Sequence, residues 1–172
     1  LCPKDKAAKY TTEPITIAAC VPTNAYYSAD FRAPLDSLSA KINNPGPTEV
    51  AAKKAYEQAG IGPQEINCFE VQDTDAFCEV EITEQLGLCK LGEAGRLLDE
   101  GVTEIGGKYP INMSGGLISK GEPIGASHLG QVFEVVQQLR GKAGQRQVPD
   151  AKVGLAHVLG AGNNCAVTIL KR

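Results

Sequence analysis

The chain has 172 residues, of which 42% are hydrophobic, so it can bury one sizeable core, and we expect residues 1–172 to form a single domain. Seventeen Lys and Arg against twenty Asp and Glu give a net charge of −3, and with no basic run and only 5% aromatic residues the composition argues against nucleic acid as a partner. No run of about 18 apolar residues occurs, so we expect no membrane span and a cytoplasmic location.

The first predicted elements are a strand, a long connection and a helix. Residues 15–21 form a continuous apolar run between two prolines, which predicts a strand covered on both faces and therefore central in its sheet. Residues 22–47 show no period, and their three aromatic residues favour a binding loop over simple disorder. Pro47 then begins an alanine-rich helix that ends at Gly60.

The next strand brings polar residues to the edge of the sheet. Residues 66–71 are predicted to form this strand, with Gln72 and Asp73 at its carboxyl end, where open α/β sheets bind their ligands. Further along the chain we predict helices over residues 76–86 and 93–100, and a short strand over residues 109–112.

A glycine-rich loop follows and leads into a helix. Residues 112–125 include four glycines, a density typical of a bent backbone that a ligand can approach closely. The helix is predicted to bury one stripe formed by Leu129, Val132, Phe133, Val136 and Leu139. Unpaired N–H groups and the helix dipole at this junction favour a carboxylate, a thioester oxygen or a phosphate. The alternative is that the glycines only form tight turns.

The chain ends in a predicted β-hairpin. Residues 152–159 and 165–170 are strands joined by a connection that begins at Gly160. Together, these elements predict an α/β fold with a mixed sheet of about five strands, helices on both faces and a C-terminal β-hairpin. The six cysteines include no CxxC pair, so we expect reduced thiols and no metal site.

Two motifs carry a resemblance to a known family. SGGLISKGEPIGAS, with the helix after it, resembles the SGG…KGHPxGATG signature of the thiolase superfamily, particularly its sterol-carrier or lipid-transfer branch. AYEQAGIGPQEINCFEVQD resembles the segment in which that family places its EVHDAF tetrad. The resemblance covers roughly residues 10–172. Glu122 stands in place of the GHP histidine, Gln72 in place of the tetrad histidine, and Val158 in place of the acid/base cysteine of thiolases.

The resemblance implies a C-terminal thiolase domain. The N-terminal thiolase half, which carries the nucleophilic cysteine in the family, is absent from this chain and would lie on the same gene product or on another chain. The complete protein is expected to form a homodimer and to have a zinc-ribbon/OB-fold partner. A coenzyme A thioester would be its substrate, and no cofactor would be bound permanently.

The resemblance also implies the site residues. Those expected to be catalytic are Gln72, Asp73, Glu122 and His157. Those expected to contact coenzyme A or the acyl group are Ser114, Gly115, Gly116, Gly121, His128 and Gly160. Gln72 can still hold a water or an oxyanion with its amide N–H. Glu122 could be a general base or a capping acid at the following helix, and His157 could be catalytic or structural.

Three hypotheses about function remain open. In the first, the complete protein is an acyl-CoA enzyme that performs acyl transfer or makes or breaks C–C bonds in lipid metabolism. In the second, the same site is a retro-aldol lyase of β-hydroxyacyl-CoA in lipid or sterol side-chain breakdown. In the third, the chain is a noncatalytic acyl-CoA-binding or scaffold subunit.

Overall fold

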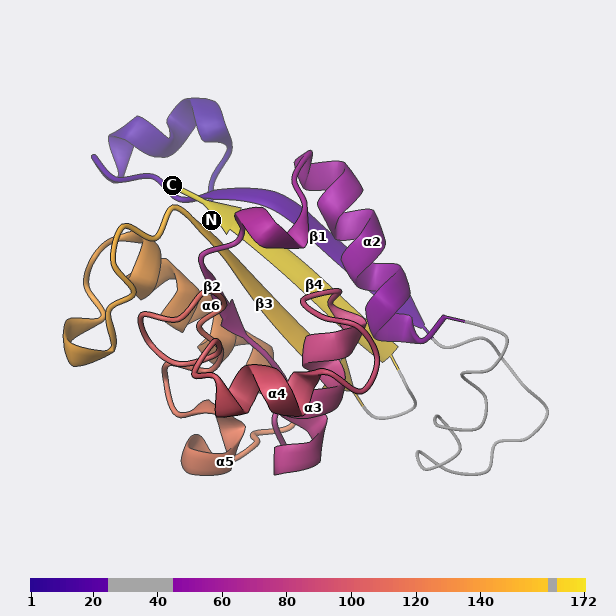
Figure 1. Cartoon of the computed structure of the whole chain (residues 1–172). Helices are drawn as coiled ribbons and strands as arrows, with labels where there is room; N and C mark the ends of the chain where they lie inside the picture. Colours follow the sequence, from indigo (N-terminus) through magenta and orange to yellow (C-terminus); the bar gives the residue numbers. More distant parts are fainter. Residues whose placement is uncertain (25–44, 161–163) are drawn as a thin grey trace.

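The computed structural model describes residues 1–24, 45–160 and 164–172 (Figure 1). The strands are β1 (Thr16–Asn24), β2 (Cys68–Glu70), β3 (Val153–Gly160) and β4 (Asn164–Lys171). The α-helices are α2 (Pro47–Ala59), α3 (Ala76–Gln85), α4 (Ala94–Asp99), α5 (Gly116–Lys120) and α6 (Ser127–Leu139). Short 3-10 turns are η1 (Lys4–Lys9), η3 (Pro63–Glu65) and η4 (Gly144–Arg146).

The four described strands form one mixed sheet in the order β1-β4-β3-β2. β4 is antiparallel to both β1 and β3, and β2 is parallel to β3. α2 contacts β1 and β4, whereas α6 contacts β3 and β2. Figure 1 shows α2, α3 and α4 on the near side of the sheet and α6 behind it. The predicted α/β fold, with helices on both faces and a C-terminal hairpin, is confirmed.

Each face of the sheet has its own apolar core. Leu155, Val167 and Ile169 pack with the alanines of α2 in one cluster, while Ala156 and Leu170 pack with Val135 in the other. Successive strand residues point to opposite faces, so β3 and β4 contribute to both clusters. The sheet is therefore a central layer buried between two cores, and the ends of its strands are where side chains can reach a ligand.

The prediction of a central first strand is wrong. β1 pairs with β4 on one side and forms one edge of the described sheet, and Ala19 is its one buried residue. α2 covers one face of β1, but α6 lies over β3 and β2, so the apolar run is not covered on both faces. The expected strand over residues 109–112 forms a single bridge, Ile111 with Phe69, which leaves four strands instead of about five.

The predicted buried stripe of α6 is confirmed only in part. Leu139 is buried, and Val132 and Val136 pack against the same core. Leu129 and Phe133 are 71% and 63% exposed, whereas Gln131, Glu134 and Gln138 are buried. The buried polar side chains have partners in the chain, such as Arg146 for Glu134. The helix therefore buries Val135 and Leu139 together with several polar side chains, and it turns Leu129 and Phe133 outwards.

The predicted long loop falls mostly outside the described residues. β1 extends to Asn24 and α2 begins at Pro47, so both ends of the range 22–47 belong to regular elements. Residues 25–44, which contain the three aromatic residues of this stretch, are not among those described. Within the described parts of the chain, no helix has the length and apolarity needed to cross a bilayer.

Candidate functional site

A cleft of about 740 Å³ opens at the end of the sheet where β1, β2 and β3 terminate. These three strands run in the same direction, and ligands of open α/β sheets bind at the carboxyl ends of such strands. The strand ends, the start of α3 and the loop before α6 supply its described lining, which consists of Pro22, Thr23, Asn24, Gln72, Thr74, Cys78, Glu122, Ile124, Gly125, Ser127, His128, Val158, Leu159, Gly160, Asn164, Cys165 and Ala166.

Gln72 and Glu122 meet in this cleft, although 50 positions separate them in the sequence. Gln72 follows β2, and Glu122 lies in the loop between α5 and α6. The Nε2 of Gln72 donates a hydrogen bond to Oε1 of Glu122. The structure therefore brings together the two residues that replace the family's histidines.

The contact changes what Gln72 can offer a ligand. Its side-chain N–H₂ is directed to Glu122, while its Oε1 is buried and has no hydrogen-bond partner among the described residues. Gln72 is 3% exposed, and a buried acceptor without a partner is uncommon. The sequence suggested an amide donor for an oxyanion; in the structure that donor is already bound to Glu122, and the amide oxygen is buried and unpaired among the described residues.

His157 lies behind Gln72, is fully buried, and does not line the cleft. The backbone N–H of Gln72 donates to its Nδ1 at 3.5 Å, so in a neutral ring Nε2 carries the hydrogen and donates to the Thr48 hydroxyl at 3.0 Å. Burial, together with the nearby His128, lowers the pKa of His157 to about 3. The ring is neutral at physiological pH and acts as a support between α2 and Gln72.

His128 lines the cleft from the first turn of α6. Its Nδ1 lies 3.0 Å from Gln131 Oε1, and its Nε2 lies 3.0 Å from the hydroxyl of Thr168. The carbonyl oxygen can only accept, so Nδ1 carries the hydrogen and Nε2 accepts from the Thr168 hydroxyl. Burial lowers the pKa of His128, partly offset by Gln131. Both ring nitrogens have protein partners, so His128 shapes the wall of the cleft as a neutral ring.

Asp73 turns away from the cleft and binds the glycine loop. Its Oδ1 accepts the backbone N–H of Leu117 at 2.6 Å. Gly116 has φ +65° beside this carboxylate, and a Cβ there would collide with both oxygens of Asp73. Burial raises the pKa of Asp73, and the backbone hydrogen bond from Leu117 opposes that rise. This glycine is thus explained by close approach to Asp73.

Ser114 and Gly115 also use their hydrogen bonds within the chain. The backbone N–H of Ser114 donates to Glu70 at 3.1 Å, and the N–H of Gly115 donates to the carbonyl of Asn112 at 2.9 Å. Of the residues expected to contact coenzyme A, the cleft brings together His128 and Gly160 with the Gln72–Glu122 pair. Those outside its described lining are Ser114, Gly115, Gly116 and Gly121.

Three residues that line or support the candidate site were missed from the sequence. Glu70 is an acid inside an apolar strand, and that mismatch was the available signal for a buried polar partner. Cys78 lies in the first turn of the helix that Asp75 caps, and this helix follows the strand that positions Gln72. Its position at the same end of the sheet as Gln72 could therefore have been inferred. Thr23 was hidden because Pro22 was taken as the end of the strand.

The described residues contain no cluster of three or more His, Cys, Asp or Glu side chains arranged for a metal ion. A second hollow, of about 560 Å³, lies beside Tyr56 and Gly87, away from every predicted site residue. The Gln72–Glu122 cleft is therefore the candidate site.

Similarity to known proteins identifies the family of this chain. The thiolase C-terminal domain-like family matches residues 39–172. Sterol carrier protein 2 of Rattus norvegicus is 50% identical over 121 residues, which is 70% of this chain and 22% of that protein. Acetyl-CoA acetyltransferase of Methanothermobacter thermautotrophicus is 37% identical over 173 residues, which covers 100% of this chain and 43% of that protein.

A solved structure, the Ltp2-ChsH2(DUF35) aldolase, superposes with a TM-score of 0.78 at 22% identity, over 98% of this chain and 42% of that chain. This similarity shows the fold. The chain spans less than half the length of these relatives. On the family match and the two sequence relatives, the chain belongs to the thiolase C-terminal domain-like family, within the sterol-carrier-type branch of the thiolase superfamily.

Proposed function

We propose that this chain is the C-terminal half of a thiolase-like enzyme that makes or breaks a C–C bond, or transfers an acyl group, on a coenzyme A thioester. The observation that carries the proposal is the Gln72–Glu122 contact in a cleft at the carboxyl ends of the strands. Thioester chemistry is also in the names of two relatives, the acetyl-CoA acetyltransferase and the benzoylsuccinyl-CoA thiolase subunit BbsB of Thauera aromatica, the latter 40% identical over 116 residues, 67% of this chain and 30% of that protein.

Glu122 is the proposed general base. Its Oε1 accepts from Gln72, so the carboxylate is held in one orientation while it lines the cleft. A carboxylate accepts a proton from a hydroxyl or a water molecule that hydrogen-bonds to it. Catalysis through an acyl-enzyme would also need a nucleophilic cysteine, which the proposal places on the N-terminal half.

One observation favours a second candidate, a retro-aldol lyase of β-hydroxyacyl-CoA. The Glu122 carboxylate is an acceptor that lines the cleft, and the Gln72 N–H₂ is already bound to it, so the pair suits a ligand that brings a hydroxyl hydrogen. In that reaction Glu122 takes the proton of the β-hydroxyl, the bond between the α- and β-carbons breaks, and the β-carbon becomes a carbonyl. The solved structure of similar fold is named an aldolase.

The partner half is proposed to cover the outer face of α6 and the loop before it. Leu129 and Phe133, one helical turn apart on α6, are 71% and 63% exposed, and Ile124 in the preceding loop is 98% exposed. Exposed large apolar side chains of this kind are typical of interfaces. We also propose that the complete protein is a homodimer and that a DUF35-type subunit of the zinc-ribbon/OB-fold kind is a further partner, by analogy with the two-component name of the structural neighbour.

Product analysis tests these proposals. The complete protein, with both thiolase halves, would be incubated with a β-ketoacyl-CoA plus coenzyme A, and separately with a β-hydroxyacyl-CoA. Shortened acyl-CoA from the first substrate supports thiolysis, and an aldehyde or ketone from the second supports aldol cleavage. Tight binding of both esters without any product would instead indicate a binding or scaffold subunit.

Variants connect the activity to the cleft. Glu122→Gln keeps the size of the side chain and an oxygen for Gln72, but it removes the base, so we expect a 10²-fold or greater loss of turnover. Glu57→Gln is the matched control, because Glu57 is an exposed acid on α2 outside this cleft. Unchanged turnover in Glu122→Gln would exclude Glu122 as the base.

A further inference from the structure

Cys78 brings a thiol to the wall of the same cleft. It lies in the first turn of α3 and lines the cleft together with Gln72 and Glu122. Its Sγ is 3.3 Å from Asp75 Oδ2, which accepts its hydrogen, and 3.5 Å from the Thr74 hydroxyl. None of the positions that the thiolase resemblance singles out holds a thiol in this chain.

An independent observation indicates that this part of the cleft is built for a ligand. The Gln72 side chain is 3% exposed, lines the cleft, and leaves its Oε1 without a partner among the described residues. A buried acceptor is costly unless a hydrogen-bond donor satisfies it. The wall of the cleft therefore combines an unsatisfied buried acceptor on Gln72 and the Glu122 carboxylate with a proton-bearing group on Cys78.

The surroundings of Cys78 favour the thiol over the thiolate. Burial raises the pKa of Cys78, and the Asp75 carboxylate raises it further, against an opposing hydrogen bond from Thr74. A protonated thiol is a weak nucleophile but a usable acid. Asp75 is exposed, so the thiol can exchange its hydrogen-bond partner for a ligand without breaking a buried contact.

We propose that Cys78 is the acid that protonates the α-carbon of the acyl-CoA when a C–C bond is broken in this cleft. The inference rests on the proposed function, because it needs an enolate. When the bond between the α- and β-carbons breaks, the electron pair stays on the α-carbon as the thioester enolate. The S–H bond of Cys78 then breaks as the new C–H bond forms, which leaves a thiolate.

The cycle closes through solvent. Glu122 accepts the hydroxyl proton in the aldol case and releases it to water, and the Cys78 thiolate takes a proton from water. One proton leaves the substrate and one enters the product, so no oxidant, reductant or further reactant is needed. Two separate groups handle the two protons, which accounts for both a carboxylate and a thiol in one cleft.

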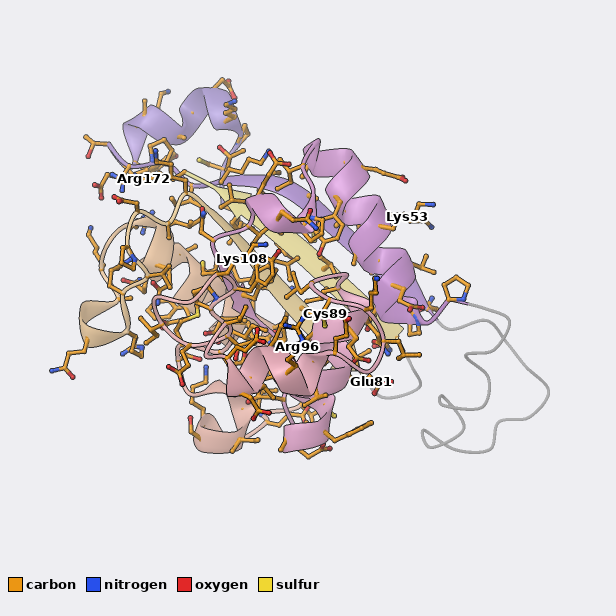
Figure 2. All side chains as sticks on the ribbon, viewed as in Figure 1. Lys53, Glu81, Cys89, Arg96, Lys108 and Arg172 are labelled. Atoms are coloured by element: carbon orange, nitrogen blue, oxygen red, sulfur yellow. The ribbon has the colours of Figure 1, made fainter. Side chains whose placement is uncertain are left out.

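The test is exchange of the α-hydrogens of acetyl-CoA and propionyl-CoA with D₂O, followed by proton NMR in the complete protein. Cys78→Ala and Cys78→Ser are compared with Cys89→Ser, which changes a similarly half-buried thiol near Arg96 and outside the cleft (Figure 2). We expect exchange to fall 10²-fold or more in both Cys78 variants and to stay at the wild-type rate in Cys89→Ser. Acyl-CoA affinity by calorimetry should stay within about 2-fold in all three, which also shows that the variants are folded.

A second measurement needs no variant. Alkylation of wild-type Cys78 by iodoacetamide, read by peptide mass spectrometry, should slow at saturating acetyl-CoA, while alkylation of Cys89 should not change. Wild-type exchange that persists in both Cys78 variants, or Cys78 alkylation that bound acetyl-CoA does not slow, would overturn the assignment while leaving the proposed function standing. A wild-type protein that binds and cleaves no acyl-CoA would overturn the proposed function itself, and this inference with it.

Discussion

Glu70 in β2 accepts two hydrogen bonds from Ser114, from the backbone N–H at 3.1 Å and from the hydroxyl at 2.5 Å. Lys120 lies 3.7 Å from the same carboxylate and donates to the Ser114 hydroxyl at 2.5 Å. Three residues after Glu70, Asp73 accepts the N–H of Leu117. The end of β2 therefore binds the glycine loop at two points, and this places Glu122, at the end of that loop, against Gln72.

Glu70→Gln should change how stability depends on pH. Burial raises the pKa of Glu70 from 4.5. The folded chain therefore holds this proton at pH values where the unfolded chain has released it, so the contribution of Glu70 to stability falls as pH rises through its folded pKa. Glutamine does not titrate, and its oxygen can still accept from Ser114. In urea unfolding at several pH values above about 4.5, the free energy of unfolding of the variant should rise relative to that of the wild type as pH rises. A constant difference across that range would contradict this account.

His157 should give the opposite pH trend. Its pKa in the folded chain is about 3, below the ordinary value of 6.5, so the unfolded chain binds the proton first as the solution is acidified. The neutral ring therefore contributes its full stability above pH 6.5, and this is lost as pH falls towards about 3. Asn cannot titrate, so the free energy of unfolding of His157→Asn should fall less steeply on acidification than that of the wild type. Identical acid dependence in wild type and variant would show that His157 is not buried as a neutral ring.

The two contacts of His157 can be separated by substitution. Asn can place an oxygen near the position of Nδ1, which accepts from the Gln72 backbone, whereas Gln can reach the position of Nε2, which donates to Thr48. If His157 supports Gln72, His157→Asn should retain more turnover than His157→Gln while the two are equally stable. Steady-state kinetics and thermal unfolding of the complete protein make the comparison. Equal turnover would limit His157 to a packing role.

Gly116→Ala should destabilise the chain more than Gly60→Ala. Both glycines have positive φ, +65° and +66°, so both substitutions cost about 1 kcal/mol of backbone strain. At Gly116 the new Cβ also collides with Asp73, whereas at Gly60 nothing lies within 4 Å. We expect Gly116→Ala to lower the free energy of unfolding by about 2 to 4 kcal/mol in all. Equal losses in the two variants would mean that the Asp73 contact imposes no constraint on the loop.

Much of the fold was predictable because local signals agreed with tertiary structure. Pro47 and Gly60 bound α2 as expected, and Asp75 caps α3 by accepting from the N–H of Cys78. The edge position of β1 was not predictable, because an apolar run does not specify which neighbours cover it. The outward Leu129 was missed for a related reason: apolar periodicity identifies a helix face but not whether that face meets this domain or another.

The site was predictable only in part. Two motif substitutions, Gln72 and Glu122, do meet in one cleft, whereas most of the predicted glycine-loop residues lie outside its described lining. Which of the two side chains donates depends on side-chain geometry that sequence spacing cannot give. The same is true of the hydrogen bonds that the glycine-loop N–H groups donate to Glu70 and Asp73. The sequence alone assigned those amides to a thioester, because loop composition shows only that N–H groups are present and not what they bind.

Substitutions on the outer face of α6 should weaken association without unfolding the chain. Phe133→Ser removes an exposed apolar side chain, so the free energy of unfolding of this chain should change by no more than about 0.5 kcal/mol. If the N-terminal thiolase half packs on this face, the same change should weaken binding between the two halves supplied as separate chains by 10-fold or more, because large apolar residues dominate interface energies.

Val135→Ala is the control from the buried face of the same helix, and it should lower stability by about 1 to 3 kcal/mol through a cavity. Size-exclusion chromatography and calorimetry of the two halves measure association, and urea unfolding measures stability. Association that survives Phe133→Ser together with Leu129→Ser would place the partner half on a different surface.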